Sequence, residues 1–247
     1  MEFEHVSVLL QESVDWLVTD PDGIYVDCTL GGAGHSQKIA SLLSVRGRLI
    51  GIDQDEEALA AAQERLAKAA CRVDIVKANF KDLASVLSRL QVQAVNGVLF
   101  DLGVSSHQLD MAERGFSYMH DGPLDMRMDQ QTEKTAAFVV NTYSEEALAD
   151  LIWRYGEERW HKRIAQFIVL TRQKAPLTTT FQLVDVIKKA IPKGARKDGP
   201  HPAKRTFQAL RIEINDELGI LEQAVDDAIS ALVSGGRIGV ITFQSLE

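Results

Sequence analysis

A glycine-rich segment at residues 27–36 is the first candidate for chemistry in this chain. It has the sequence Asp-Cys-Thr-Leu-Gly-Gly-Ala-Gly-His-Ser and follows a short apolar run that predicts a strand. Glycine lacks a Cβ atom, so such a backbone can approach a ligand closely at the carboxyl end of a strand, where open α/β sheets bind ligands. The dinucleotide fingerprint G-x-G-x-x-G fits poorly, because Gln37 stands in place of its third glycine. The segment therefore predicts a ligand-binding turn, with a purely structural tight turn as the alternative.

Two aspartates end apolar runs at positions where they could hold a nucleoside-type ligand. Asp53 stands 19 residues after Gly34, where a carboxylate can accept hydrogen bonds from both hydroxyls of a ribose. The alternative for Asp53 is an exposed acid beside the acidic cluster at 55–57, which could simply favour a helix N-terminus. Asp101 ends a wholly apolar run and could hold an amine. Phe80 could cover one face of an adenine, or it could be an ordinary core residue.

The elements that must position these residues alternate along the first hundred residues. Strands are predicted at 24–29, 48–53, 73–78 and 95–102. Apolar residues at helical spacing lie between these runs, and the fourth run is apolar almost throughout, as expected for a strand covered on both faces. This alternation predicts an α/β fold with a doubly wound, mainly parallel sheet.

Residues 105–205 interrupt this pattern. They contain helical patterns at 145–155 and 159–172 but no convincing strand. A segment of this length is too long to be a loop. We therefore expect an inserted, mainly helical subdomain that divides a core made of residues 1–104 and 206–247.

The α/β pattern resumes after the insertion. Apolar residues recur every three or four positions from Phe207 to Leu232, which predicts one long helix. Gly235 and Gly236 would end this helix as a left-handed C-cap, before a fifth strand at 237–244. The chain stops three residues later, so we expect the C-terminal part of the sheet to be missing from it.

Composition limits the class of protein. Hydrophobic residues make up 45% of the chain and charged residues 25%, which indicates a packed globular core. The first residues lack the pattern of a signal peptide, and no apolar stretch approaches the ~20 residues that cross a bilayer. Cys28 and Cys71 form no CxxC pair, so we expect buried, reduced thiols and a cytoplasmic location. Asp121, Asp125 and Asp129 resemble no calcium loop, and no metal is expected.

Positive charge is concentrated in one segment, although the net charge of the chain is −8. An acidic protein can still hold RNA where its basic residues gather. The cluster consists of Lys188, Lys189, Lys193, Arg196, Lys197, Lys204 and Arg205. It predicts contacts with phosphates, with a charged, solvated loop as the alternative.

Several stretches, spread in order over the whole chain, carry a resemblance to one family. They are His-Val-Ser-Val-Leu-Leu at 5–10, Gly-Gly-Ala-Gly-His-Ser at 31–36, Asp-Leu-Gly-Val-Ser-Ser-His-Gln-Leu-Asp at 101–110, the run 113–128, Tyr-Gly-Glu-Glu-Arg at 155–159, the run 201–211 and Ser-Leu-Glu at 245–247. The sequence resembles the bacterial small-subunit (16S) ribosomal RNA cytosine-N4 methyltransferases, which modify a cytidine in the decoding centre. That family continues well past the last of these stretches.

The resemblance implies a class I methyltransferase fold, S-adenosylmethionine as the cofactor, and 16S ribosomal RNA or the small ribosomal subunit as the partner. By position, the cofactor-binding residues would be Gly31, Ala33, Gly34, His35, Asp53, Phe80, Asp101 and Gln108. The catalytic candidates are Asp101, Ser105 and Phe116. Amino-methyltransferases of bases often carry an acid-Pro-Pro-aromatic motif, whereas Leu-Gly-Val follows Asp101 here. The aromatic residue that stacks on the cytosine must then come from elsewhere, and we choose Phe116.

Two other functions remain open on the sequence. A nicotinamide-dependent reductase would use the same kind of crevice, but the third glycine and the hydride-relay residues are missing from the sequence. A non-enzymatic ribosome-assembly factor would explain the basic cluster, but it would leave the glycine-rich turn, Asp53 and Asp101 without a role.

Overall fold

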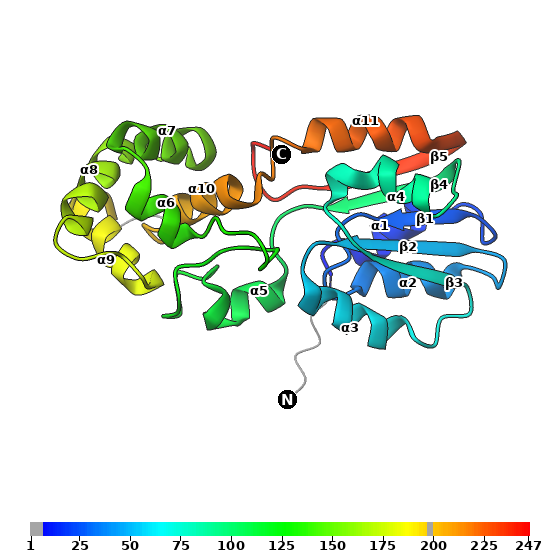
Figure 1. Ribbon diagram of the computed structural model, residues 1–247. Coiled ribbons are helices and arrows are strands. Elements are labelled where there is room, and N and C mark those ends of the chain that lie inside the picture. The colour runs from blue at the N-terminus through cyan, green and yellow to red at the C-terminus, as the bar shows by residue number, and fades with distance from the viewer. Residues whose placement is uncertain (1–6, 197–199) are drawn as a thin grey trace. The chain divides into compact units, whose positions relative to one another are not determined.

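The computed structural model describes residues 7–196 and 200–247, and the chain forms two compact units (Figure 1). The first unit comprises Met1–Ser105 and Leu218–Glu247, and the second comprises Ser106–Glu217. Residues 5 and 6, which begin the first family-like stretch, and Lys197 of the basic cluster lie outside the described residues.

The first unit is built around a parallel sheet (Figure 1). Its strands are β1 Ile24–Asp27, β2 Arg48–Asp53, β3 Arg72–Lys77, β4 Val95–Asp101 and β5 Leu232–Ile241. They lie in the order β3-β2-β1-β4-β5, and each neighbouring pair runs parallel. The chain therefore builds outward from β1 in one direction and then from β4 in the other, which confirms the predicted doubly wound α/β fold. The carboxyl ends of β1 and β4 lie side by side where the direction reverses.

Helices cover both faces of this sheet. They are α1 Leu10–Leu17, α2 Gly34–Leu42, α3 Glu56–Leu66, α4 Leu83–Arg89 and α11 Leu221–Ala231, with a short 3₁₀ turn η1 at Phe80–Asp82. Successive strand residues point to opposite faces. Tyr25 and Leu49 are buried with residues of α1, α2 and α3, whereas Val26 and Ile50 are buried with residues of α4 and α11. Both cores hold the carboxyl ends of the strands in place.

The second unit is mainly helical (Figure 1). Its elements are α5 Ser106–Asp110, η2 Ala112–Arg114, α6 Ala136–Thr142, α7 Glu145–Gly156, α8 His161–Arg172, α9 Thr180–Ala190, η3 Lys193–Arg196 and α10 Lys204–Asn215. Ser144 caps the start of α7, and Thr179 and Gln182 form a capping box at the start of α9. Within the described part of this unit, β structure is limited to one bridge between Pro123 and Thr179.

The apolar stripe that predicts one long helix forms two helices in different units. α10 packs against α6 and α7, whereas α11 covers the sheet. Asp216 follows α10 with a left-handed backbone (φ 52°), and Arg211 forms an ion pair with Glu217 at 2.7 Å just beyond it. The expectation of a single helix is therefore wrong, and the first unit resumes at Leu218 rather than at residue 206. Periodicity shows which face of a helix is apolar, but not which core that face covers.

The last strand, β5, begins earlier than predicted and contains a bulge. Val95 of β4 pairs with Leu232, and Gly97 pairs with Arg237, so residues 233–236 of β5 stand opposite one residue of β4. Gly235 lies among these extra residues with a φ of 83°. The assignment of the glycine pair as a helix C-cap is therefore wrong. A glycine with a positive φ occurs both in bulges and at helix C-caps, so the sequence cannot distinguish the two.

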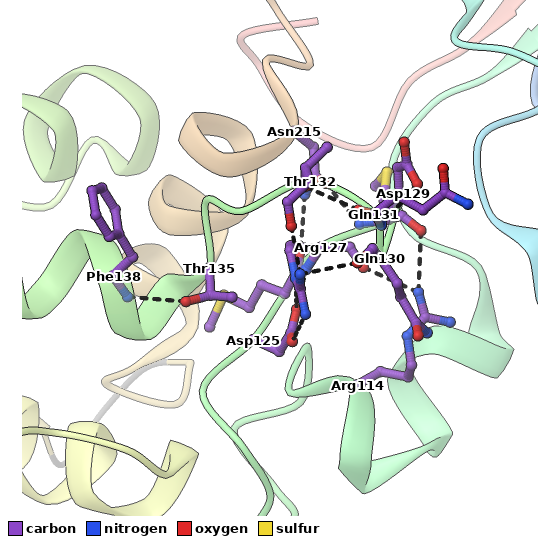
Figure 2. Close-up of polar contacts among 12 residues, drawn as sticks. Arg114, Asp125, Arg127, Asp129, Gln130, Gln131, Thr132, Thr135, Phe138 and Asn215 are labelled. Atoms are coloured by element: carbon purple, nitrogen blue, oxygen red, sulfur yellow. Dashed lines mark hydrogen bonds and ion pairs between the residues drawn. The ribbon is translucent and has the colours of Figure 1, made fainter.

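An arginine holds an ordered loop in the second unit, at residues 122–135 (Figure 2). Nε and Nη2 of Arg127 donate to the two carboxylate oxygens of Asp125, at 2.8 and 2.6 Å. Nη1 of the same guanidinium donates to the carbonyl oxygens of Gln130 and Thr132. A two-pronged ion pair of this kind fixes the geometry of both partners. Asp125 is therefore the carboxylate that orients Arg127 within the loop.

Two further side chains fasten this loop to its neighbours. Asn215, at the end of α10, accepts a hydrogen bond from the backbone N–H of Met128 at 2.8 Å and donates to the carbonyl oxygen of Met126 at 2.9 Å. Arg114 donates to the carbonyl oxygens of Arg127 and Met128, at 3.0 and 3.3 Å. Met126 is fully buried and has a left-handed backbone (φ 64°). The loop is thus held through its backbone from two sides.

Replacing Gly115 by alanine is expected to destabilise the second unit strongly. Gly115 has a φ of 72°, and a Cβ atom there would lie 2.2 Å from the carbonyl oxygen of Pro123 and 2.8 Å from the backbone nitrogen of Asp125. Left-handed strain and overlap with a backbone together cost about 2–5 kcal/mol. Thermal unfolding followed by circular dichroism measures the loss. Gly194→Ala is the control, because a Cβ atom at Gly194 meets nothing within 4 Å; equal unfolding temperatures of the two variants would contradict this loop geometry.

Candidate active site

The glycine-rich turn between β1 and α2 is held by a buried carboxylate. Asp27 is 1% exposed, and it accepts hydrogen bonds from the hydroxyl of Ser36 at 2.7 Å and the backbone N–H of Thr29 at 3.2 Å. Burial raises its pKa, and the two hydrogen bonds oppose that rise. Gly31 and Ala33 both have left-handed backbones, with φ of 47° and 58°. The side chain of Asp27 therefore holds the glycine-rich turn in place.

Asp53 joins the end of β2 to this turn. Its Oδ2 accepts a hydrogen bond from the backbone N–H of Gly31 at 2.8 Å, and its Oδ1 accepts one from the backbone N–H of Asp55 at 2.9 Å. Burial raises the pKa of Asp53 to about 6. Each carboxylate oxygen keeps further acceptor capacity for a ligand. The residue that caps α3 is Asp55, whose side chain accepts a hydrogen bond from the backbone N–H of Glu57. The role at a helix N-terminus that the sequence left open for Asp53 is therefore filled by Asp55.

Asp101 ends β4 and faces His35 from the start of α2. Its Oδ2 lies 3.5 Å from Nδ1 of His35, and its backbone N–H donates to the hydroxyl oxygen of Thr29 at 2.6 Å. Its Oδ1 is buried and has no hydrogen-bond partner among the described residues. Burial raises the pKa of Asp101 to about 6; His35 lowers it, while the charges of Asp27 and Glu247 raise it. Asp101 therefore presents an unused acceptor at the strand end.

The environment of His35 fixes the position of one ring proton. The side chain is 5% exposed, and its Nε2 lies 3.0 Å from the carbonyl oxygen of Val8. A carbonyl oxygen only accepts, so Nε2 carries a proton. Its Nδ1 faces Oδ2 of Asp101 at 3.5 Å, which is longer than an ordinary N–H···O hydrogen bond. His35 and Asp101 therefore interact through their charges, and His35 favours the ionised form of Asp101.

The structure brings together the glycine-rich turn, His35, Asp53 and Asp101 in the first unit. Phe80 also lies there, half-buried in η1, with the edge of its ring packed against Phe100 (6.0 Å between centroids, planes at 89°). Asp27 is a residue of this cluster that sequence reasoning did not single out. Its signal was present, because a charged residue that ends a buried strand needs a partner.

The other predicted site residues lie elsewhere along the chain. Ser105 is the last residue of the first unit before the second begins, and Gln108 is a buried residue of α5. Phe116 is 5% exposed, and the guanidinium of Arg114 lies 5.8 Å from its ring centroid. A ring so enclosed offers little surface for a base to stack on. Tyr118, two residues after Phe116, has a more exposed aromatic ring.

Part of the basic cluster surrounds an open hollow in the second unit. Lys188 and Lys189 end α9, Lys193 begins η3, and all three line a hollow of about 540 Å³. Lys204 and Arg205 begin α10, and Arg205 donates to the carbonyl oxygen of Glu157 at 2.6 Å. The side chain of Arg196 falls, like Lys197, outside what the structure describes.

Two general features concern helix length and the cysteines. Across residues 7–196 and 200–247, each helix is too short or too polar to cross a bilayer. Cys28 and Cys71 are both buried and unbridged, as expected from their spacing.

Known proteins similar to this chain include ribosomal RNA methyltransferases. The chain is 58% identical over 247 residues to the "Ribosomal RNA small subunit methyltransferase H" of Clostridioides difficile (strain 630), which covers 100% of this chain and 79% of that protein. It is 56% identical over 247 residues to the protein of the same name from Symbiobacterium thermophilum, covering 100% and 78% of the two chains. A solved structure described as a putative rRNA-methylase from Clostridium thermocellum is 25% identical to this chain and covers 40% of it and 54% of its own length. Its TM-score of 0.35 is too low for the likeness to bear on fold or function. The model of the MraW methylase family matches residues 2–247, so the resemblance seen in the sequence is confirmed, and the chain belongs to the MraW methylase family.

Proposed function

We propose that this chain transfers a methyl group from S-adenosylmethionine to the N4 amino group of a cytidine in the decoding centre of small-subunit (16S) ribosomal RNA. The family and the names of the relatives support a methyltransferase that acts on this RNA. The single observation that carries the proposal is the placement of Asp53 and Asp101 at the ends of β2 and β4, on either side of the glycine-rich turn. A reaction on ribosomal RNA would place the protein in the cytoplasm.

The residues at the turn fit the chemical groups of this cofactor. Asp53 keeps acceptor capacity for the two ribose hydroxyls beyond its bonds to Gly31 and Asp55. Oδ1 of Asp101, which is buried and has no hydrogen-bond partner within the described part of the chain, suits the ammonium of the amino-acid portion or the amino group of the base. Phe80 offers a half-buried ring for the adenine. We assign the remaining contacts to Ala33, Gly34, His35 and Gln108.

The chain's own residues would make the amino group of cytosine reactive. When bound, S-adenosylmethionine supplies an electrophilic methyl group on a sulfonium. The lone pair of the cytosine amino group is delocalised into the ring, so an acceptor must hold this group in a pyramidal geometry. Asp101, or the backbone at Ser105, would accept a hydrogen bond from it, and the carboxylate of Asp101, which faces His35, would receive its proton. Holding two reactants in place can contribute ~7–11 kcal/mol, so most of the catalysis would come from positioning.

The second unit would bind the RNA. Lys188, Lys189 and Lys193 around their hollow suit phosphates, which position RNA without specifying its sequence. Specificity would come from an unpaired base and from the shape of the RNA around it. Mobile, solvated lysines are the ordinary alternative, and the salt dependence of binding separates the two.

The direct test is methyl transfer to small-subunit ribosomal RNA and to the isolated small subunit, followed by nucleoside mass spectrometry. We expect N4-methylcytidine as the product. Methylation at a carbon atom or at the ribose would contradict the proposed acceptor. Calorimetry with S-adenosylhomocysteine and with NADH tests the competing functions, because a reductase would bind NADH and an assembly factor would bind neither.

Affinity for S-adenosylhomocysteine is expected to fall as the pH is lowered through about 6. Burial raises the pKa of Asp53 and of Asp101 to about 6, so both acids take up protons there and lose charge and acceptor capacity. The stability of the free protein has the opposite sign. Both folded pKa values lie above the ordinary 3.8, so the contribution of these acids to stability is present at low pH and is lost as the pH rises to about 6.

Calorimetry between pH 5 and pH 8 measures how the affinity depends on pH. If the two carboxyl groups cause this dependence, it becomes weaker in Asp53→Asn and in Asp101→Asn. An affinity that stays constant over this range in the unmodified protein would contradict the assignment of both acids to the cofactor site.

A further inference from the structure

A stacked aromatic pair joins two distant segments of the second unit. The rings of Tyr118 and His201 are parallel, with their centroids 4.6 Å apart and their planes at 7°. Phe207 of α10, which is 3% exposed, meets the Tyr118 ring edge-on at 5.8 Å. Both Tyr118 and His201 remain partly exposed. A buried phenylalanine thus supports a pair of rings that solvent can reach.

The protonation of His201 suits it to contact a nucleic-acid base. Its Nδ1 accepts a hydrogen bond from the backbone N–H of Ala203 at 3.2 Å, so the proton of the neutral ring lies on Nε2. Burial lowers the pKa of His201, and the charge of Lys188 lowers it further. At neutral pH the ring is therefore uncharged. The described residues give Nε2 no partner, so its N–H is available as a donor beside the stack.

Positive charge lies within electrostatic reach of this pair. Lys188 acts on the titration of His201, and it also lines the hollow that Lys189 and Lys193 share. Asp185 is the acidic residue of that lining. Three ammonium groups around one hollow favour an anion, and one of them, Lys188, acts electrostatically on a ring that favours a flat, uncharged partner. A nucleotide carries both chemical groups.

We propose that Tyr118 and His201 form a platform on which one unpaired base of the RNA stacks, while Lys188 and its neighbours hold an adjoining phosphate. This inference rests on the proposed function, because it names residues that would hold the RNA whose cytidine is methylated. Sequence-specific proteins bind RNA mainly through single-stranded bases that stack on aromatic side chains. Tyr118 and His201 belong to the second unit, whereas Asp53 and Asp101 belong to the first.

The test uses the full chain and a short single-stranded oligoribonucleotide of the small-subunit ribosomal RNA that carries the fluorescent base 2-aminopurine. Stacking quenches this fluorescence, so quenching at saturating protein reports the stacked base, and titration reports the affinity. We expect Tyr118→Leu to weaken binding by about 10- to 100-fold and to abolish the quenching, whereas Tyr118→Phe keeps both within about twofold.

A second variant guards against an effect on folding. His201→Asn removes the ring but keeps a side-chain acceptor for the N–H of Ala203, and it is expected to lose the quenching as Tyr118→Leu does. Lys188→Gln should instead keep the quenching and lower the slope of log affinity against log salt by about 0.7. Quenching that survives in both Tyr118→Leu and His201→Asn, or no quenching by the unmodified protein, would overturn the platform. N4 methylation by the unmodified protein is scored separately, so the proposed function stands or fails on its own.

Discussion

Asp101→Asn is expected to lower the rate of methyl transfer by about 10²–10⁴-fold, the range for loss of a proton-accepting group. The substitution keeps the shape of the side chain but removes its charge. The side chain then no longer presents a charged oxygen to Nδ1 of His35, nor at the Oδ1 position, which has no hydrogen-bond partner among the described residues. The rate is measured in a single turnover at saturating S-adenosylmethionine, which separates chemistry from binding.

Asp74→Asn is the matched control for this prediction. Asp74 is an acid of β3 in the same sheet, and it forms ion pairs with Arg48 at 2.6 Å and Arg72 at 3.1 Å rather than facing the glycine-rich turn. Its replacement is expected to leave the single-turnover rate within about threefold, as for a distant and independent site. If Asp101→Asn retained more than about a tenth of the rate, Asp101 would not be the proton acceptor.

Asp53→Ala is expected to weaken binding of S-adenosylhomocysteine by about 10- to 150-fold. A charged hydrogen bond is worth about 1.5–3 kcal/mol, which gives this range of affinities. The substitution also frees the backbone N–H of Gly31, so the turn loses the bond that ties it to β2. Calorimetry at pH 8, well above the pKa of about 6 for Asp53, measures the change with the carboxylate charged.

Asp55→Asn serves as the control, because asparagine can still cap α3. It changes a neighbouring acid without removing an acceptor from the turn, so the affinity should stay close to that of the unmodified protein. A loss of less than about threefold in Asp53→Ala, under ~0.7 kcal/mol, would show that Asp53 does not hold the ribose.

The local order of the chain could be predicted from sequence for the first unit. β2 runs from Arg48 to Asp53 as expected, and β1 and β4 begin at the predicted Ile24 and Val95. Apolar runs mark buried strands directly, because a strand covered on both faces carries mostly apolar side chains. The same reasoning placed Asp53 and Asp101 at the ends of strands. Because the strands of a parallel sheet run in one direction, both residues lie at the carboxyl edge of the sheet.

Helical periodicity could be predicted, but the core that each helix joins could not. The stripe from Phe207 to Leu232 satisfies the spacing of one helix, yet its first half packs in the second unit and its second half covers the sheet. Asp216 takes the left-handed conformation that separates them. A single aspartate at that position gives no clear stop signal, because glycine is the usual residue there.

The sequence by itself determined the α/β class, the glycine-rich turn and the two acids beside it, since each depends on short apolar runs and on residues next to them. Only the tertiary structure decided which side chains from distant segments meet. His35 faces Asp101, and Tyr118 stacks on His201, although neither pair is close in the chain. Burial also raised the pKa of Asp53 and Asp101, because desolvation depends on all surrounding atoms and not on neighbours in sequence. Local patterns specify elements, whereas contacts and electrostatics arise only when those elements pack together.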